Sequence, residues 1–336
     1  MKGGDKQEGL RVPLGRGREF DAIRRFIAQQ GPLPPEVRLG PGDDAAVVSG
    51  GWTVSTDLSV EGVHYRREWI LDREVGYRAT AAALSDLAAM GANAVGILAS
   101  VAAPLDGGVD LDAVQAGIAE AARIFDAGVL GGDLSGSPGP LVVDITALGR
   151  THWPILRSGA EPGDELWVTG PLGAAAAAVR IWKEGGEPSP ELRRRFARPI
   201  PRIREACCLV EEERTHALID ISDGLVGDAG HLAAAGGVRV VIEAARVPVH
   251  PAAAAAVGRE EALALALHGG EDYELLFAAP VGLVNPERFL RHFQVELVRV
   301  GRVEEGSGVW LDEGEGEPRP AVWGGYDHLL RKEETE

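Results

Sequence analysis

The feature that most constrains the fold is an alternation of apolar, strand-like runs with helix-like runs along the first half of the chain. The run "AAVVSGGWTVST" (45–56) predicts two short strands around a Gly-Gly turn, because glycine accepts the positive φ that tight hairpins need. The later runs, in chain order, predict a helix at 72–91 with Asp72 as its N-cap, a strand at 94–103, a helix at 110–125 and a strand at 141–150. This order predicts an α/β unit with a mixed sheet. The Gly- and Ser-rich run "GGDLSGSPGP" (131–140) is predicted to be a loop.

A chain of 336 residues predicts two domains, and prolines and glycines place the boundary near 151–162. We expect a flexible extension at 1–17, an N-terminal domain over 18–150, a C-terminal domain over 151–330 and a tail at 331–336. The first domain opens with a helix, since "REFDAIRRFIAQQ" has helical apolar spacing. The second reads as an α+β sandwich with helices on one side of a sheet. Its segments "DISDGLVGDAG" (220–230) and 304–319 are predicted to be loops.

Composition excludes several classes of function. A net charge of −17 argues against direct binding of nucleic acid. No apolar run reaches the ~18–20 residues that cross a bilayer, and the N-terminus has no signal-peptide core, so we expect a cytoplasmic protein without membrane contact. Cys207 and Cys208 are adjacent, which suits core packing rather than a disulfide or a zinc site. The sequence contains neither a GxxxxGK[ST] loop nor a GxGxxG motif after a strand.

Four aspartates of the first half lie among small residues with no basic neighbour. They are Asp44, Asp57, Asp86 and Asp133. Asp86 shares a helical stripe with Ala82, Ala83 and Met90, a surface expected to face the core, where an unpaired carboxylate costs several kcal/mol. Any one of the four could simply cap a turn. Four in one domain favour a shared Mg²⁺ or Mn²⁺ site, because hard cations prefer oxygen ligands.

The second half adds further polar groups beside glycines. "LIDISDGL" places Asp220, Ser222 and Asp223 at a strand end, and "HGGEDYELLF" places Glu271 after two glycines that permit close backbone approach. Arg157, in "LRSGAEPG", carries a guanidinium group whose paired N–H donors suit phosphate oxygens. Each has an ordinary alternative: Asx turns for the acids and a surface ion pair for the arginine. His64 is either a ligand contact or a satisfied loop histidine, and spacing does not decide between them.

These motifs together resemble a known family. "GDDAA", "STDLSVEGVH", "LSDLAAMGA", "GGD", "RSGAEPGD", "ISDGL", "GGEDYEL" and "GYDH" occur in this order over residues 19–329. The chain is similar to the thiamine-monophosphate kinases, within the aminoimidazole-ribonucleotide-synthetase-like superfamily. The resemblance implies ATP-dependent, Mg²⁺-assisted phosphoryl transfer to thiamine monophosphate, giving thiamine diphosphate. It also implies a homodimer that pairs its N-terminal sheets, with the active site between the two domains.

The resemblance also implies roles for particular residues. The positions that match Mg²⁺ ligands are Asp44, Ser55, Thr56, Asp57, Asp86, Asp133, Asp220 and Asp223, with Asp57, Asp133 and Asp223 taken as catalytic. The positions that match ATP contacts are Gly132, Asp133, Arg157 and Ser222, and those that match the thiamine-phosphate pocket are His64, Glu271 and Tyr326. One departure is "LSG" after "GGD", where the family often carries a basic residue. Residues 1–17 have no matching segment.

The same motifs allow other functional interpretations. Selenophosphate-synthetase-like and hydrogenase-maturation-like enzymes of the same superfamily also use ATP, but the first needs a reactive cysteine near the N-terminus and the second a C-terminal cysteine. This chain has neither. A catalytically silent nucleotide sensor is the alternative outside enzymes, and only a turnover assay separates it from a kinase. The abundance of aspartates is itself explained if several Mg²⁺ ions bring ATP and a second phosphate, together roughly six negative charges, onto an acidic site.

Overall fold

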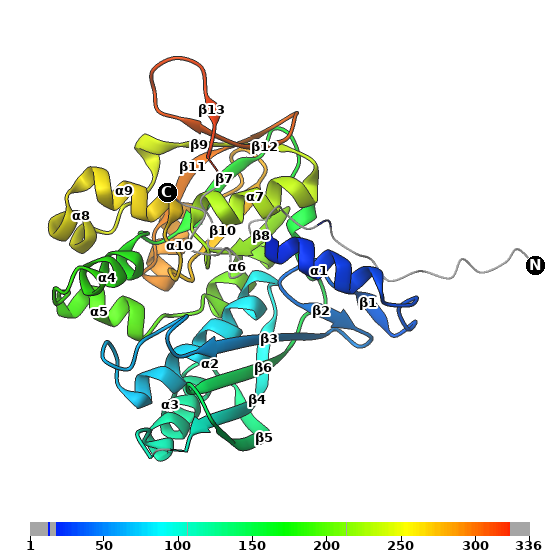
Figure 1. Cartoon of the computed structure of the whole chain (residues 1–336). Helices are drawn as coiled ribbons and strands as arrows, with labels where there is room; N and C mark the ends of the chain where they lie inside the picture. Colours follow the sequence, from blue (N-terminus) through cyan, green and yellow to red (C-terminus); the bar gives the residue numbers. More distant parts are fainter. Residues whose placement is uncertain (1–12, 14–17, 106, 213, 323–336) are drawn as a thin grey trace, which may run out of the picture.

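The computed structural model describes residues 13, 18–105, 107–212 and 214–322 (Figure 1). It contains two sheets, one in each half of the chain, with helices packed on both. The predicted extension, apart from Pro13, and the predicted tail lie outside the described residues. None of the helices in these ranges is long and apolar enough to span a membrane.

The first sheet is mixed, as predicted. Its strands are β1 (Val37–Leu39), β2 (Ala46–Val48), β3 (Trp52–Val60), β4 (Asn93–Pro104), β5 (Gly128–Ser137) and β6 (Val142–Arg150), in the order β1-β2-β3-β6-β4-β5. Only β4 and β5 run parallel among these neighbours. The turn between β2 and β3 uses Gly50 and Gly51, both at positive φ, so the predicted hairpin is confirmed.

The edge strand β5 corrects the predicted loop at 131–140. Its glycines and serines have low strand propensity, but the chain pairs with β4 over Gly128–Ser137. Gly132 fits because a Cβ there would meet the Ala99 carbonyl oxygen at 1.8 Å. Tertiary pairing thus overrides local propensity at this edge.

Helix α2 (Asp72–Ala89) is the central helix of the first half, and it is buried on nearly every side. It packs on β3 and β6 on one side and on α3 (Leu111–Ile124) on another, and α1 (Arg18–Ala28) confirms the predicted opening helix. The predicted N-cap is off by one residue. Leu71 precedes the helix, and its N–H donates to the Glu74 carboxylate at 2.9 Å. Asp72 instead accepts from the Asp110 N–H at 2.8 Å and so joins the starts of α2 and α3.

The second sheet is mainly antiparallel. Its strands are β7 (Glu165–Thr169), β8 (Ala217–Asp220), β9 (Arg239–Glu243), β10 (Leu275–Ala279), β11 (Leu297–Glu304), β12 (Gly308–Asp312) and β13 (Arg319–Pro320), in the order β13-β12-β9-β11-β7-β10-β8. The helices of this half are α4 (Ala174–Lys183), α5 (Pro190–Ala197), α6 (Ile203–Glu212), α7 (Leu225–Gly236), α8 (Pro251–Val257), α9 (Arg259–His268) and α10 (Pro286–Phe293), with 3₁₀ turns η1 (Arg157–Gly159) and η2 (Ala244–Arg246).

Helices cover both faces of the second sheet, whereas the sequence predicted helices on one face. Leu166 and Val168 of β7 share a core with α7, while Trp167 between them belongs to the core that holds α4 and α10. Alternation along each strand therefore buries both faces. Two further predicted loops are partly regular: α7 begins at Leu225 inside 220–230, and β12 lies inside 304–319. Among the described residues, neither cysteine forms a disulfide; both are half-buried, and Cys208 packs against the main core as expected.

Candidate active site

Three predicted carboxylates meet where the two halves touch. Asp44 precedes β2, Asp86 lies on α2 and Asp220 ends β8, and each offers an oxygen within 4.8 Å of the others. Hydroxyl groups hold two of them: Ser55 donates to Asp86, and Ser85 donates to Asp220 at 2.6 Å. Because α2 carries Asp86 and Ser85 in one turn, a single helix orients the group on both halves.

Burial and mutual repulsion weaken the acidity of this triad. The pKa of Asp220 rises to about 7, first because it is buried and then because Asp44 is close. Burial, followed by the charges of Asp220 and Asp57, raises the pKa of Asp86 well above its usual range. A cation among these oxygens would relieve both effects.

Arg157 joins this group from the second half. Its Nε donates to Asp44 Oδ2 at 2.9 Å and its Nη2 donates to Asp44 Oδ1, while its backbone N–H donates to Asp43 at 3.2 Å. Asp44, which has no basic neighbour in the sequence, therefore pairs with an arginine of the second half. The partner lies 113 positions away in the sequence, so local inspection does not reveal it. The adjacent Asp43 has no predicted role, and burial raises its pKa to about 7, with the nearby Asp44 charge adding to the effect.

Strand β3 presents its predicted ligands on two faces. Ser55 and Asp57 lie on the face toward α2, and burial followed by the charge of Glu271 raises the pKa of Asp57 to about 6. The Thr56 side chain points to the opposite face, where it donates to Asp144 at 2.9 Å. Ser55 and Asp57, but not the Thr56 side chain, therefore lie toward the triad.

Gly132 and Asp133 lie on the edge strand β5. Register places Gly132 in one row with Ala99, Ile145 and Asp57, whereas Asp133 lies in the next row, beside Ser100 and Asp144. Successive rows face opposite sides of a sheet, so Asp133 and Asp57 are on different faces. Asp133 is exposed, and in the described part of the chain it is not among the carboxylates grouped around a common point.

A second group forms around the start of α7. Asp223, Asp228 and His231 each place a ligand atom within 4.8 Å of the others, and the Asp223 N–H donates to Asp228 at 3.1 Å. Burial lowers the pKa of His231 to about 3, and its Nδ1 has no hydrogen-bond partner among the described residues. Asp228 and His231 were missed. The i, i+3 spacing in "DAGH" was the available signal, but helical core residues show the same spacing.

The loop that carries Glu271 lies against the loop that carries Ser222. The Glu271 N–H donates to the Ser222 carbonyl at 2.9 Å, and the Tyr273 N–H to the Ile221 carbonyl at 2.8 Å. A Cβ on Gly270 would meet the Ser222 oxygen at 2.0 Å, so the predicted close backbone approach is confirmed. Ser222, a predicted ATP contact, and Glu271, a predicted acceptor contact, are thus neighbours.

The structure describes one of the other two predicted acceptor contacts, His64. His64 closes the turn after β3, where its Nδ1 accepts from the Val60 N–H at 3.0 Å. Tyr326 lies outside the described residues, as does the rest of "GGYDHLL".

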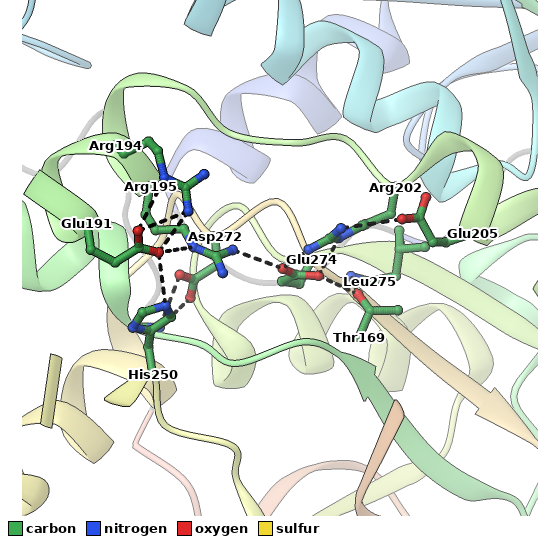
Figure 2. A network of polar contacts seen from close by, with 11 residues as sticks. Thr169, Glu191, Arg194, Arg195, Arg202, Glu205, His250, Asp272, Glu274 and Leu275 are labelled. Carbon is green, nitrogen blue, oxygen red and sulfur yellow. Dashed lines mark hydrogen bonds and ion pairs between the residues drawn. The ribbon is translucent and has the colours of Figure 1, made fainter. Parts of the chain in front are cut away.

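A polar network borders a depression beside Glu271 (Figure 2). Arg202 is bound through two nitrogens to Glu274, at 2.7 and 2.6 Å, and Thr169 donates to the same carboxylate at 2.7 Å. Asp272 accepts from the Gly173 N–H at 2.8 Å at the start of α4, and burial raises its pKa to about 8. Sequence reasoning missed the Arg202–Glu274 pair, because its two residues are 72 positions apart in the sequence.

The fold and this junction define a class of protein. Residues 42–151 match the family "AIR synthase related protein, N-terminal domain", and residues 161–311 match its "C-terminal domain". This chain is thus an AIR-synthase-related protein, built of both characteristic halves.

Individual proteins that are similar to this chain narrow the class to one family. The thiamine-monophosphate kinase of Mycobacterium tuberculosis is 39% identical over 275 residues, which are 78% of this chain and 81% of that protein. That of Escherichia coli is 32% identical over 321 residues, or 93% and 98% of the two chains. The solved structure "AaThiL complexed with AMPPCP and TMP" has a TM-score of 0.77 at 30% identity and covers 92% of this chain and 96% of that one. The chain belongs to the thiamine-monophosphate kinase family.

Proposed function

We infer that this protein transfers the γ-phosphoryl group of ATP to thiamine monophosphate, giving thiamine diphosphate and ADP. The observation that carries this inference is the convergence of Asp44, Asp86 and Asp220 at the junction of two halves that both match the kinase family. A nucleotide analogue and TMP are named together in the similar structure described above. The chain therefore has the fold, the relatives and the acidic junction of such an enzyme.

We propose Mg²⁺ as the metal, and the residues fit it. The triad supplies only carboxylate oxygens, which Mg²⁺ prefers, and their raised pKa values mark a site that favours added positive charge. The proposed ligand set is Asp44, Ser55, Asp57, Asp86, Asp220 and Asp223. The predicted ligands Thr56 and Asp133 are left out, because their side chains lie on the opposite face of the first sheet. When bound, Mg²⁺ would neutralise the negative charge that develops on the phosphates during transfer.

The chain's own residues bind and orient the two substrates in this proposal. Gly132, Asp133, Arg157 and Ser222 contact ATP. The Nη1 of Arg157 takes no part in its hydrogen bonds to Asp44 within the described ranges, so this nitrogen remains to donate to a phosphate oxygen. His64, Glu271 and Tyr326 contact the thiamine end of the acceptor, where a carboxylate can accept from an amino group and an aromatic ring can stack.

Phosphoryl transfer asks little covalent chemistry of the protein, so in this proposal Asp57 and Asp223 act by position and charge. A kinetic assay tests the proposal. Purified protein with ATP, Mg²⁺ and thiamine monophosphate is expected to form thiamine diphosphate and ADP in equal amounts. Nucleotide binding without turnover would instead identify a silent sensor.

We also propose that the enzyme is a homodimer joined through its N-terminal sheets, with domains at 18–150 and 151–330. The outer face and edge of the first sheet support this arrangement. Leu58 and Leu98 on that face and Leu134 on β5 are exposed by 40 to 53%. Apolar side chains grouped beside the outer edge of a terminal strand are typical of an interface.

A further inference from the structure

Arg78 is a buried cation that crosses the junction between the two halves. It lies on α2 and its side chain is only 3% exposed. Its Nη2 is ion-paired with Glu271 Oε2, and its Nη1 donates to the Phe196 carbonyl at 2.7 Å. The guanidinium also lies over the Phe196 ring, 4.1 Å from its centroid. Every one of these partners belongs to the second half.

The Glu271 carboxylate is held from two sides through the same oxygen. Tyr273 donates its hydroxyl to Oε2 at 2.7 Å, and Arg78 pairs with that atom as well. In the described part of the chain, Oε1 takes part in neither bond, and the Glu271 side chain is 25% exposed. One oxygen is thus anchored, while the other remains able to accept from a ligand.

The backbone around this carboxylate is constrained. Glu271 and Tyr273 have φ of +76° and +51°, the left-handed region that side-chain-bearing residues enter at a cost of roughly 1–3 kcal/mol each. Such a backbone conformation persists where surrounding contacts stabilise it. The contacts that Arg78 and Tyr273 make with Glu271 Oε2 supply this stabilisation. A buried arginine without its carboxylate would leave an uncompensated charge, so the pair strongly favours one arrangement.

We propose that Arg78 is a positioning residue for the phosphate acceptor: it fixes the Glu271 carboxylate so that Oε1 faces the acceptor site. This inference rests on the proposed function, because it takes Glu271 as a contact to the thiamine end. Arg78 acts through Glu271 and does not itself touch the transferred phosphoryl group. The ordinary alternative is that Arg78 only joins the two halves, and that role predicts different kinetics.

The test compares Arg78→Met, Arg78→Lys and Tyr273→Phe by steady-state kinetics and thermal melting. Arg78→Met is expected to raise KM for thiamine monophosphate ~10-fold or more, with KM for ATP changed by less than about twofold, since Arg78 pairs directly with the acceptor residue Glu271. Arg78→Lys should restore part of the loss, because it keeps the charge without the planar fork. Tyr273→Phe should raise the acceptor KM less, because it removes one of two anchors.

Arg73→Met is the matched control, because Arg73 lies on the same helix and forms an exposed ion pair with Glu120. It should leave both KM values unchanged. If Arg78→Met does not fold, Tyr273→Phe and Arg78→Lys still decide the question through the acceptor KM. Equal changes in both KM values together with a lower melting temperature would overturn the positioning role. A wild-type protein that does not phosphorylate thiamine monophosphate would overturn the proposed function instead.

Discussion

At the scale of single residues, Asp220 shows how burial sets the chemistry of this site. Asp220 is 4% exposed, and its carboxylate accepts a hydrogen bond from the Ser85 hydroxyl and lies close to Asp44 and Asp86. Water cannot stabilise the ionised form there, and the neighbouring charges oppose it. The same arrangement that makes the metal-free carboxylate weakly acidic is the reason why we propose a divalent cation there.

The first prediction concerns pH and stability. The pKa of Asp220 rises from 3.8 in the unfolded chain to about 7 in the fold, so between these values the native state binds the extra proton. Stability from this group therefore falls as pH rises from about 4 to about 7 and is constant above that. Asp220→Asn removes this dependence. In metal-free buffer, its melting temperature relative to wild type should rise from pH 5 to pH 8. A difference that stays constant across this range would contradict the assigned shift.

The second prediction concerns Asp57, which faces α2 beside the triad. Asp57→Asn is expected to lower kcat roughly a hundredfold or more, because it removes a charged oxygen from the proposed Mg²⁺ site. The fold should remain intact, since burial already disfavours the charge at this position. Circular dichroism and a coupled ADP assay measure the two effects. Asp126→Asn, an exposed residue paired with Arg204, serves as control. Near-normal turnover by folded Asp57→Asn would remove this residue from the site.

At the scale of elements, periodic segments were predictable and the edge strand was not. The helices at 72–91 and 110–125 and the strand at 141–150 follow from spacing that local sequence displays. The carboxylates Asp44, Asp86 and Asp220 were also identified in advance. Strand β5 was missed because pairing with β4, rather than its own composition, makes it a strand. The Arg157–Asp44 and Arg78–Glu271 pairs were missed because their partners are 113 and 193 residues apart.

The third prediction tests the close packing of β5. Gly132→Ala places a Cβ 1.8 Å from the Ala99 carbonyl oxygen, so the strand must shift from β4. The melting temperature should fall by several degrees, as for a loss of ~1–3 kcal/mol. Gly139→Ala in the following turn meets nothing closer than 3.9 Å and should have little effect. Equal stability of the two variants in thermal melting would show that β5 does not pair as described.

At the scale of the whole molecule, two arginines join the halves in opposite directions. Arg78 reaches from the first half to Glu271, and Arg157 reaches from the second half to Asp44. Both guanidinium groups are mostly buried, with side chains 3% and 15% exposed. Each pair fixes one proposed site residue relative to the other half, so the junction and the site are the same structure. In the proposed function, substrate groups that bind at this junction contact both halves at once.

The last prediction concerns assembly. The face of the first sheet opposite α2 carries Leu98 and Leu58, and the β5 edge beside it is exposed along its length. We expect sedimentation of the wild-type protein at micromolar concentration to give twice the 35.4 kDa chain mass. Leu98→Glu should shift the protein toward the single-chain mass, because a buried interface disfavours an unpaired charge. Val281→Glu, at an exposed position of the second half, should leave the dimer unchanged. A wild-type species of single-chain mass, or a Leu98→Glu protein that stays dimeric, would place the interface elsewhere or exclude it.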